Sequence, residues 1–152
     1  MEANLNYRNS KNETVYDIAY EQVDKDNLEV MRILVNYDIN GFKEKIIWDS
    51  IKHDDEDHIE FFKFLIENQI DINIKVKDNN TPLGIAILSK KEELVDYLLK
   101  NNPDILNIND YNQNIYELAL SNINNDNNND DDKGKSILQK LMNIDIVNKL
   151  KI

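Results

Sequence analysis

The sequence predicts an all-α fold, a helical-repeat solenoid of about four helix-turn-helix units. Two observations predict it: a short motif recurs at a spacing of 33 residues, and apolar residues at helical spacing follow each copy. The clearest copy is TPLGIA at 81–86, with NIYELA at 114–119 and TVYDIA at 14–19. Because the first and second of these in the chain are 67 residues apart, one more unit fits between them, and we place it at IWDSI, 47–51.

Each copy of the motif is expected to open the first helix of a repeat. Thr81 is a suitable N-cap, and Pro82 follows at the first helical position, where a missing N–H costs no hydrogen bond. A small residue recurs at one phase, because stacked helices have to approach closely there, and a larger side chain should overpack the array. These small residues are Ala19, Ser50, Ala86 and Ala119.

The second helices are predicted over residues 28–37, 58–69, 92–102 and 135–144, where apolar side chains recur at i, i+3, i+4 and i+7. Each stripe should be buried around an apolar pair, namely Ile33-Leu34, Leu65-Ile66 and Leu98-Leu99 in the first three units. We expect the large aromatic side chains to lie in the core or to line a groove; these are Trp48, Phe61, Phe62, Phe64 and Tyr97.

The ends of the array are expected to be capped, because terminal repeats would otherwise expose a stacking face. Residues 145–152 are predicted to form a short amphipathic tail over the last repeat. At the other end, the first repeat is either its own cap or one member of a longer array.

An Asn precedes three of the first helices at the same phase, at positions 12, 79 and 112. Asn is the residue other than Gly that most readily adopts a positive φ. The turns before the first helices are therefore predicted to contain a left-handed residue at these positions.

The TPLGIA motif, the Leu98-Leu99 pair and the spacing of 33 residues resemble the ankyrin repeat, whose first helix opens with a Thr-Pro-Leu-His-x-Ala pattern. The resemblance covers nearly the whole chain as a single domain, residues 1–152, with repeats at about 4–37, 38–70, 71–103 and 104–144. It is closest in the third unit, while Ile39-Asn40-Gly41-Phe42 shortens the turn of the second. The resemblance implies short turn or β-finger connections and a noncatalytic, protein-binding function.

The resemblance also implies an interaction surface, made of the turn tips and the exposed ends of the first helices. We call it the concave face. By phase its members are Arg8, Ser10, Lys11, Glu13, Glu21 and Gln22, then Lys75, Lys77, Asp78, Asn80, Leu88 and Ser89, then Ile108, Asp110, Tyr111, Gln113, Ser121 and Asn122. Tyr111 and then Arg8 are the expected anchors, because aromatic and Arg side chains dominate interface energies. Nothing is carried over into residues 38–50.

Acidic insertions lengthen three of the repeats between their two helices, at residues 22–27, 53–57 and 124–134. A loop that recurs at one phase should project from one edge of the stack, so we predict an acidic ridge there. Its members are Asp24, Asp26, Asp54, Asp55, Glu56, Asp57, Asp126, Asp130, Asp131 and Asp132. Two interpretations stay open: a landing site for a basic partner, or solvated loops that keep the protein soluble.

The formal net charge of −11 should repel nucleic acid and anionic membranes, and it favours a basic protein partner on encounter. The chain has no cysteine, no apolar run long enough to span a membrane and no signal-peptide pattern at its N-terminus. We therefore expect a soluble, cytoplasmic protein that is monomeric when free.

No catalytic, cofactor-binding or metal-binding residues are predicted, and no cofactor is expected. The chain has only three glycines and no glycine-rich phosphate loop. Asp126-x-Asn128-x-Asp130 imitates a calcium loop, but Asp131 and Ile137 stand where Gly and Glu are needed. His53 and His58 are five residues apart across a predicted loop, so they should not share a helix face as a metal-binding pair at i, i+4 would, and the chain has no third histidine. We favour a scaffold or adaptor; the alternatives are an acidic inhibitor or immunity-type protein that neutralises a basic toxin or nuclease and, least favoured, a metal-assisted hydrolase.

Overall fold

The computed structural model describes residues 4–22, 28–38, 44–53, 56–124 and 131–150. The described part contains helices and no strand, as the sequence predicts. The helices are α1 (Val15–Glu21), α2 (Leu28–Asp38), α3 (Glu44–Lys52), α4 (Glu56–Glu67), α5 (Pro82–Leu88), α6 (Glu92–Lys100), α7 (Ile115–Asn124) and α8 (Asp131–Leu150), with a 3-10 turn, η2 (Lys77–Asn79). The chain divides into two compact units, Met1–Ile74 and Lys75–Ile152.

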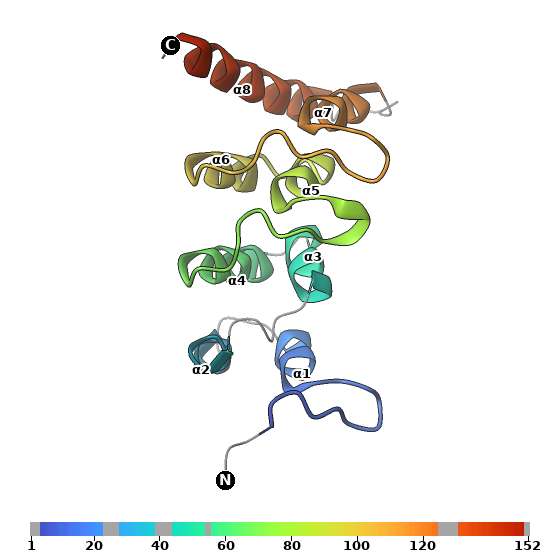
Figure 1. Cartoon of the computed structure of the whole chain (residues 1–152), viewed down its shortest axis with the longest axis vertical. Coiled ribbons are helices and arrows are strands. Elements are labelled where there is room, and N and C mark those ends of the chain that lie inside the picture. The colour runs from blue at the N-terminus through green and yellow to red at the C-terminus, as the bar shows by residue number, and fades with distance from the viewer. Residues whose placement is uncertain (1–3, 23–27, 39–43, 54–55, 125–130, 151–152) are drawn as a thin grey trace. The chain divides into compact units, whose positions relative to one another are not determined.

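In the first unit, α1 pairs with α2 and α3 pairs with α4 (Figure 1). Helix α1 starts with a capping box: the Thr14 hydroxyl accepts from the Asp17 N–H, and the Asp17 carboxylate accepts from the Thr14 N–H. Ile47 and Ile51 of α3 are fully buried, as are three apolar side chains of α4, Phe61, Phe62 and Leu65. Burial of these two stripes against each other holds the α3–α4 pair together.

In the second unit, α5 pairs with α6 and α7 packs on both α5 and α8. Thr81 caps α5 by accepting from the Gly84 N–H at 3.3 Å, and Pro82 occupies the first turn, as predicted. Residues 82–87 are all buried. A Cβ added at Gly84 would lie 3.3 Å from Leu118 Cδ1, so the absence of a side chain lets α5 and α7 approach closely.

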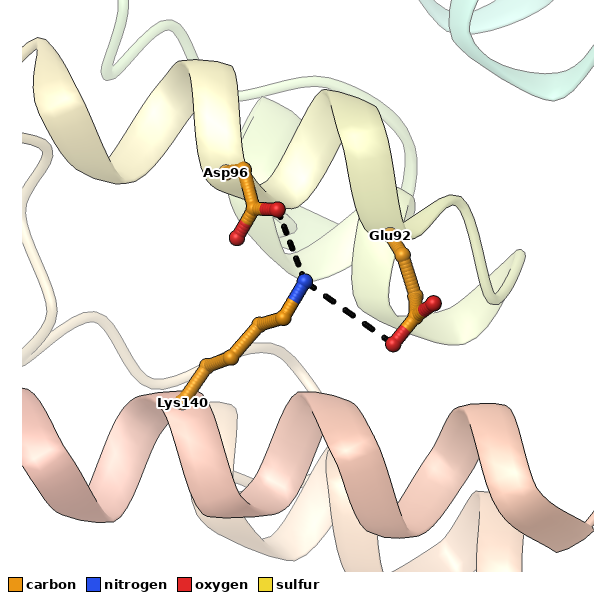
Figure 2. Close-up of polar contacts among 3 residues, drawn as sticks. All are labelled: Glu92, Asp96 and Lys140. Atoms are coloured by element: carbon orange, nitrogen blue, oxygen red, sulfur yellow. Dashed lines mark hydrogen bonds and ion pairs between the residues drawn. The ribbon is translucent and has the colours of Figure 1, made fainter.

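An ion pair joins α8 to α6 in the second unit. Lys140 Nζ donates to Asp96 Oδ2 at 2.7 Å and lies 3.8 Å from Glu92 Oε1 (Figure 2). Glu92 and Asp96 are four residues apart on α6, so both carboxylates face the same Lys. The ion pair adds a polar contact between α8 and α6, while Ile137 and Leu141 of α8 are buried in the core.

The small residues at the predicted close-approach positions are mostly in the core. Ser50, Ala86 and Ala119 are fully buried, and Ser50 Oγ donates to the Ile47 carbonyl at 2.8 Å, so its hydroxyl is satisfied. Ala19 is half-buried. Phe64, Tyr97 and Trp48 are also half-buried, consistent with groove-lining positions.

Three expectations about the second helices need correction. Ile33 is 62% exposed, whereas Leu34 and Val35 are buried, so the buried stripe of α2 lies one residue later than predicted. The loop predicted over residues 124–134 overlaps helices at both ends, because Asn124 is the last residue of α7 and residues 131–134 belong to α8. Asp132 in the first turn suits the positive end of a helix dipole. A Cβ at Gly134 would lie 3.1 Å from Ile123 Cγ1, so α8 begins tightly packed on α7.

The C-terminal segment is the third correction. Residues 145–150 continue α8 as one helix and do not form a separate short tail, because no Pro or Gly interrupts the helix after Gly134. Whether this part of α8 covers the last repeat stays a prediction.

Candidate interaction surface

A hydrogen-bonded turn precedes α1, α5 and α7 at the same repeat phase. It is closed by backbone bonds from Asn9 N to Glu13 O (2.9 Å), from Val76 N to Asn80 O (2.9 Å) and from Asn109 N to Gln113 O (3.0 Å). The Asn residues predicted to be left-handed are so, with φ of 66° at Asn12, 57° at Asn79 and 58° at Asn112. The same backbone turn therefore presents the loop tip in all three repeats.

An Asn that was not predicted from the sequence starts two of these turns. Asn109 Oδ1 accepts from Tyr111 N at 3.0 Å and from Gln113 N at 2.9 Å. Asn9 Oδ1 likewise accepts from Lys11 N at 2.9 Å and from Glu13 N at 3.0 Å. The signal was present, since an Asn stands three residues before the left-handed Asn in both turns. These side chains fix the backbone at the tip, which holds residues 10–11 and 110–111 in place.

The turns of the last two repeats, both in the second unit, are joined to each other. Asp110 N donates to Asp78 O at 3.0 Å, Asn79 Nδ2 donates to Ile108 O at 3.2 Å, and Asn107 Nδ2 donates to Asn79 O at 3.2 Å. Lys75 Nζ donates to Asn107 Oδ1. Residues 75–79 and 107–110 therefore form one continuous polar ladder beside the tip that carries Tyr111.

Most of the predicted concave face is exposed. The exposed members in the first unit are Arg8, Ser10, Lys11, Glu21 and Gln22, and those in the second are Lys75, Lys77, Leu88, Ile108, Asp110 and Tyr111. Tyr111 and Ile108 are 68% and 52% exposed, and Leu106, which the sequence analysis did not select, is 81% exposed. Three large apolar side chains thus lie in solvent on the segment before α7.

The structure corrects the concave-face prediction at Asn80, which is only 3% exposed. Its Oδ1 accepts from Asn109 Nδ2 and its Nδ2 donates to Lys77 O, both at 3.2 Å, so the side chain links two turns and is not available to a partner. The other members are half-buried, and the side chains of several of them form hydrogen bonds within their own repeat or, for Asn122, with Ile87 of the preceding one. These members are Glu13, Asp78, Ser89, Gln113, Ser121 and Asn122.

The described part of the acidic ridge is small. Glu56 is exposed and Asp57 half-buried in the first turn of α4, and Asp132 is exposed in the first turn of α8, which Asp131 opens. Acids at these places stabilise the helix N-termini, which gives them a structural role of their own. Asp24, Asp26, Asp54, Asp55, Asp126 and Asp130 lie outside the described residues, so the ridge stays a prediction.

His53 follows α3 and His58 belongs to α4, so the two histidines do not share a helix, but their rings are in contact. The ring centroids of His53 and His58 are 4.1 Å apart with an interplanar angle of 11°, and Tyr20 meets the His58 ring edge-on at 5.2 Å. Among the described residues no three His, Asp or Glu side chains are grouped as a metal site would require.

The described residues of the first unit line surface depressions that combine rings and charges. One is lined by Tyr20, Trp48, Asp49, Lys52 and His53. Another is lined by Arg32, Glu60, Lys63, Phe64 and Glu67, with the Arg32 guanidinium 4.9 Å from the centroid of the Phe64 ring. Both depressions combine an aromatic surface with charged side chains, an arrangement suited to polar or cationic protein groups.

The raised pKa of Tyr16 results from its place in the fold and does not mark a functional site. Burial raises the pKa of the Tyr16 phenol above its ordinary value of 10.0, and the nearby Asp38 and Tyr37 raise it further. The hydroxyl donates to the Asp38 carbonyl at 3.0 Å, which ties α1 to the end of α2.

None of the described helices is both long enough and apolar enough to cross a membrane. A search of curated proteins found no match for the chain. The family model of ankyrin repeats (three copies) matches residues 18–112 and, in a second placement, residues 50–149. The two matches together span residues 18–149, from within α1 to within α8, and include the turns before α5 and α7; the turn before α1 lies outside them. Ankyrin repeats are generally protein–protein interaction modules. The match shows that this chain belongs to the ankyrin-repeat family.

Proposed function

We propose that the chain is a noncatalytic scaffold or adaptor that binds a partner protein through the turns before its first helices. The observation that carries the proposal is the exposed apolar set Leu106, Ile108 and Tyr111 on the turn before α7. Apolar and aromatic side chains that stand in solvent on an ordered turn lose little freedom when a partner covers them. Tyr is also among the residues that most often anchor an interface.

The surroundings of this apolar set support an interface. Lys75 and Lys77 are exposed on the neighbouring turn, and Asp110 is exposed beside Tyr111. An apolar centre with a polar rim is the usual composition of a protein-binding patch. The polar ladder between the two turns holds the rim and the centre in a fixed relation.

Affinity capture with matched variants tests this proposal. A protein recovered with the wild-type chain should bind the Tyr111→Ser variant at least about tenfold more weakly, since removal of an interface anchor costs 2 kcal/mol or more. The control is Met142→Ser, which removes a comparably exposed apolar side chain (49%) from α8 and should bind normally. Equal affinity of both variants, measured by calorimetry, would refute the proposed surface.

The alternative is an acidic inhibitor or immunity-type protein that neutralises a basic toxin or nuclease. The net charge of −11 and the exposed Glu56 at the start of α4 favour it. Attraction between opposite charges speeds association and is screened by salt. The association rate with a basic partner should therefore fall at least about tenfold between low salt and 0.5 M salt; a rate that does not depend on salt counts against this function.

A further inference from the structure

The depression lined by Tyr20, Trp48, Asp49, Lys52 and His53 combines aromatic walls with a carboxylate. We call it the cation pocket. Tyr20 comes from the end of α1, while α3 and the residue after it supply the other four. Trp48 and Asp49 are half-buried, and Lys52 and His53 are exposed, so the pocket opens to solvent from a fixed base.

The aromatic walls support one another. The His53 ring stacks on His58 at 4.1 Å, and Tyr20 packs against His58 at 5.2 Å and against Phe61 at 5.8 Å. Phe61 is fully buried in α4. Contact with this buried ring and with His58 orders the rings of Tyr20 and His53 before any ligand arrives, which lowers the entropy cost of binding.

A cation already lies against this wall in the free protein. Lys52 Nζ is 5.4 Å from the centroid of the Trp48 ring, within the distance at which an ammonium is attracted to an aromatic face. Trp offers the strongest such attraction of the aromatic residues. The ring therefore has the position and exposure needed to hold a positive charge.

The carboxylate of the pocket and the charge of the chain favour the same kind of ligand. Asp49 adds a carboxylate to the lining, and His53 is followed in the sequence by four consecutive acids, Asp54 to Asp57. The whole chain carries a net charge of −11, which attracts a basic protein toward such a surface.

We propose that the cation pocket binds a lysine or arginine side chain of a basic partner protein, and that Lys52 is an intramolecular competitor that this side chain displaces from Trp48. The proposal rests on the protein-binding function proposed above and names a second contact point for it. It also gives Lys52 a defined effect: its ammonium occupies the ring face and repels an incoming cation, so removing it should increase affinity.

Fluorescence titration with an octalysine peptide tests the pocket directly, because Trp48 is the only tryptophan of the chain. The emission should change saturably with octalysine and not with octaserine. Lys52→Ala should bind about two- to fivefold more tightly than the wild type, and Asp49→Asn more weakly by a similar factor, the ratios expected for one exposed cation–π or charge contact.

Two variants on the same helix control for net charge. Lys45→Ala and Glu44→Gln make the same changes of charge at exposed positions of α3 that do not line the pocket, and they should change the affinity less than Lys52→Ala and Asp49→Asn do. The proposal would be overturned if Lys45→Ala changed the affinity as much as Lys52→Ala, if Glu44→Gln changed it as much as Asp49→Asn, or if the fluorescence signal did not saturate. A partner whose affinity falls with Tyr111→Ser but is unchanged with Asp49→Asn would also overturn it, while leaving the proposed function intact.

Discussion

Replacing Asn109 by Ala should destabilise the second unit and loosen the turn that carries Tyr111. The Asn109 side chain is 5% exposed and makes four hydrogen bonds. Two of them fix the backbone N–H groups of Tyr111 and Gln113, and a third satisfies the buried Oδ1 of Asn80. Alanine fills none of these roles.

The magnitude follows from the partners left behind. The two backbone N–H groups lie at an exposed turn and can rehydrate, so each lost bond costs about 0.5–1 kcal/mol. The side-chain oxygen of Asn80, Oδ1, is buried and loses its donor, at a further cost of about 1–2 kcal/mol. The expected loss is roughly 3 kcal/mol in total, which is a large part of the stability of a small domain.

Asn9→Ala is the matched control, because Asn9 makes the same two bonds to backbone N–H groups but has no buried Asn80 equivalent. Urea unfolding should show a loss of about 1–2 kcal/mol for Asn9→Ala and about 3 kcal/mol for Asn109→Ala. At a slope of about 2 kcal/mol/M the latter lowers the midpoint by roughly 1.5 M. Equal losses in the two variants, at unchanged slope, would refute the role assigned to the buried Asn80–Asn109 contact.

Three further predictions concern the turns and the packing of single helices. Asn112→Gly should unfold within about 0.5 kcal/mol of the wild type, whereas Asn112→Val should cost about 1–2 kcal/mol, because φ is 58° at this position and a branched side chain resists the left-handed region; urea midpoints of the two variants give the comparison. Lys140→Met should cost at most about 1 kcal/mol in low salt and almost nothing in 1 M salt, since the pair with Asp96 and Glu92 is partly exposed and is screened. Tyr16→Phe should cost about 0.5–1.5 kcal/mol below pH 10 through the lost bond to the Asp38 carbonyl. Because the folded-state pKa of Tyr16 is raised, the protonated phenol contributes its full stability below the unfolded value of 10.0, and this contribution is lost as pH rises toward the folded pKa. The unfolding curves of wild type and Tyr16→Phe should therefore converge above pH 10.

The elements that depend on local chemistry could be predicted from the sequence. Thr81, Pro82 and the left-handed Asn at 12, 79 and 112 act through the backbone of their own turn, and the structure confirms each of them. The repeat spacing located the helix pairs, because each pair has to bury its stripe against a neighbour at a constant interval.

The elements that depend on contacts between segments could not be predicted. Ile33 was predicted to be buried together with Leu34. Packing leaves Ile33 exposed and buries Leu34 and Val35 instead, and the sequence pattern alone does not show this. Asn80 looked like an exposed tip residue, yet Asn109, which lies 29 positions later, buries it. The contact of His53 with His58 likewise depends on how α3 and α4 pair.

Within each turn, the residues that hold the backbone differ from those that face solvent. In the turn before α1, Asn9, Asn12 and Glu13 make the structural contacts, while Arg8, Ser10 and Lys11 are exposed. The same positions of the turn before α5 carry the exposed Lys75 and Lys77.

The turn tips before α1 and α5 are therefore basic, although the chain as a whole is acidic. The turn before α1 and the connection after it lie at opposite ends of one helix of about 10 Å, Val15–Glu21. The cation pocket contains Tyr20 from the far end of this helix. The basic tips and the cation pocket therefore favour different groups of one partner, because like charges brought together cost binding energy. The tips that carry Arg8 and Lys11 would repel the basic side chain that enters the cation pocket. The part of the partner that meets these tips should instead present apolar or acidic groups.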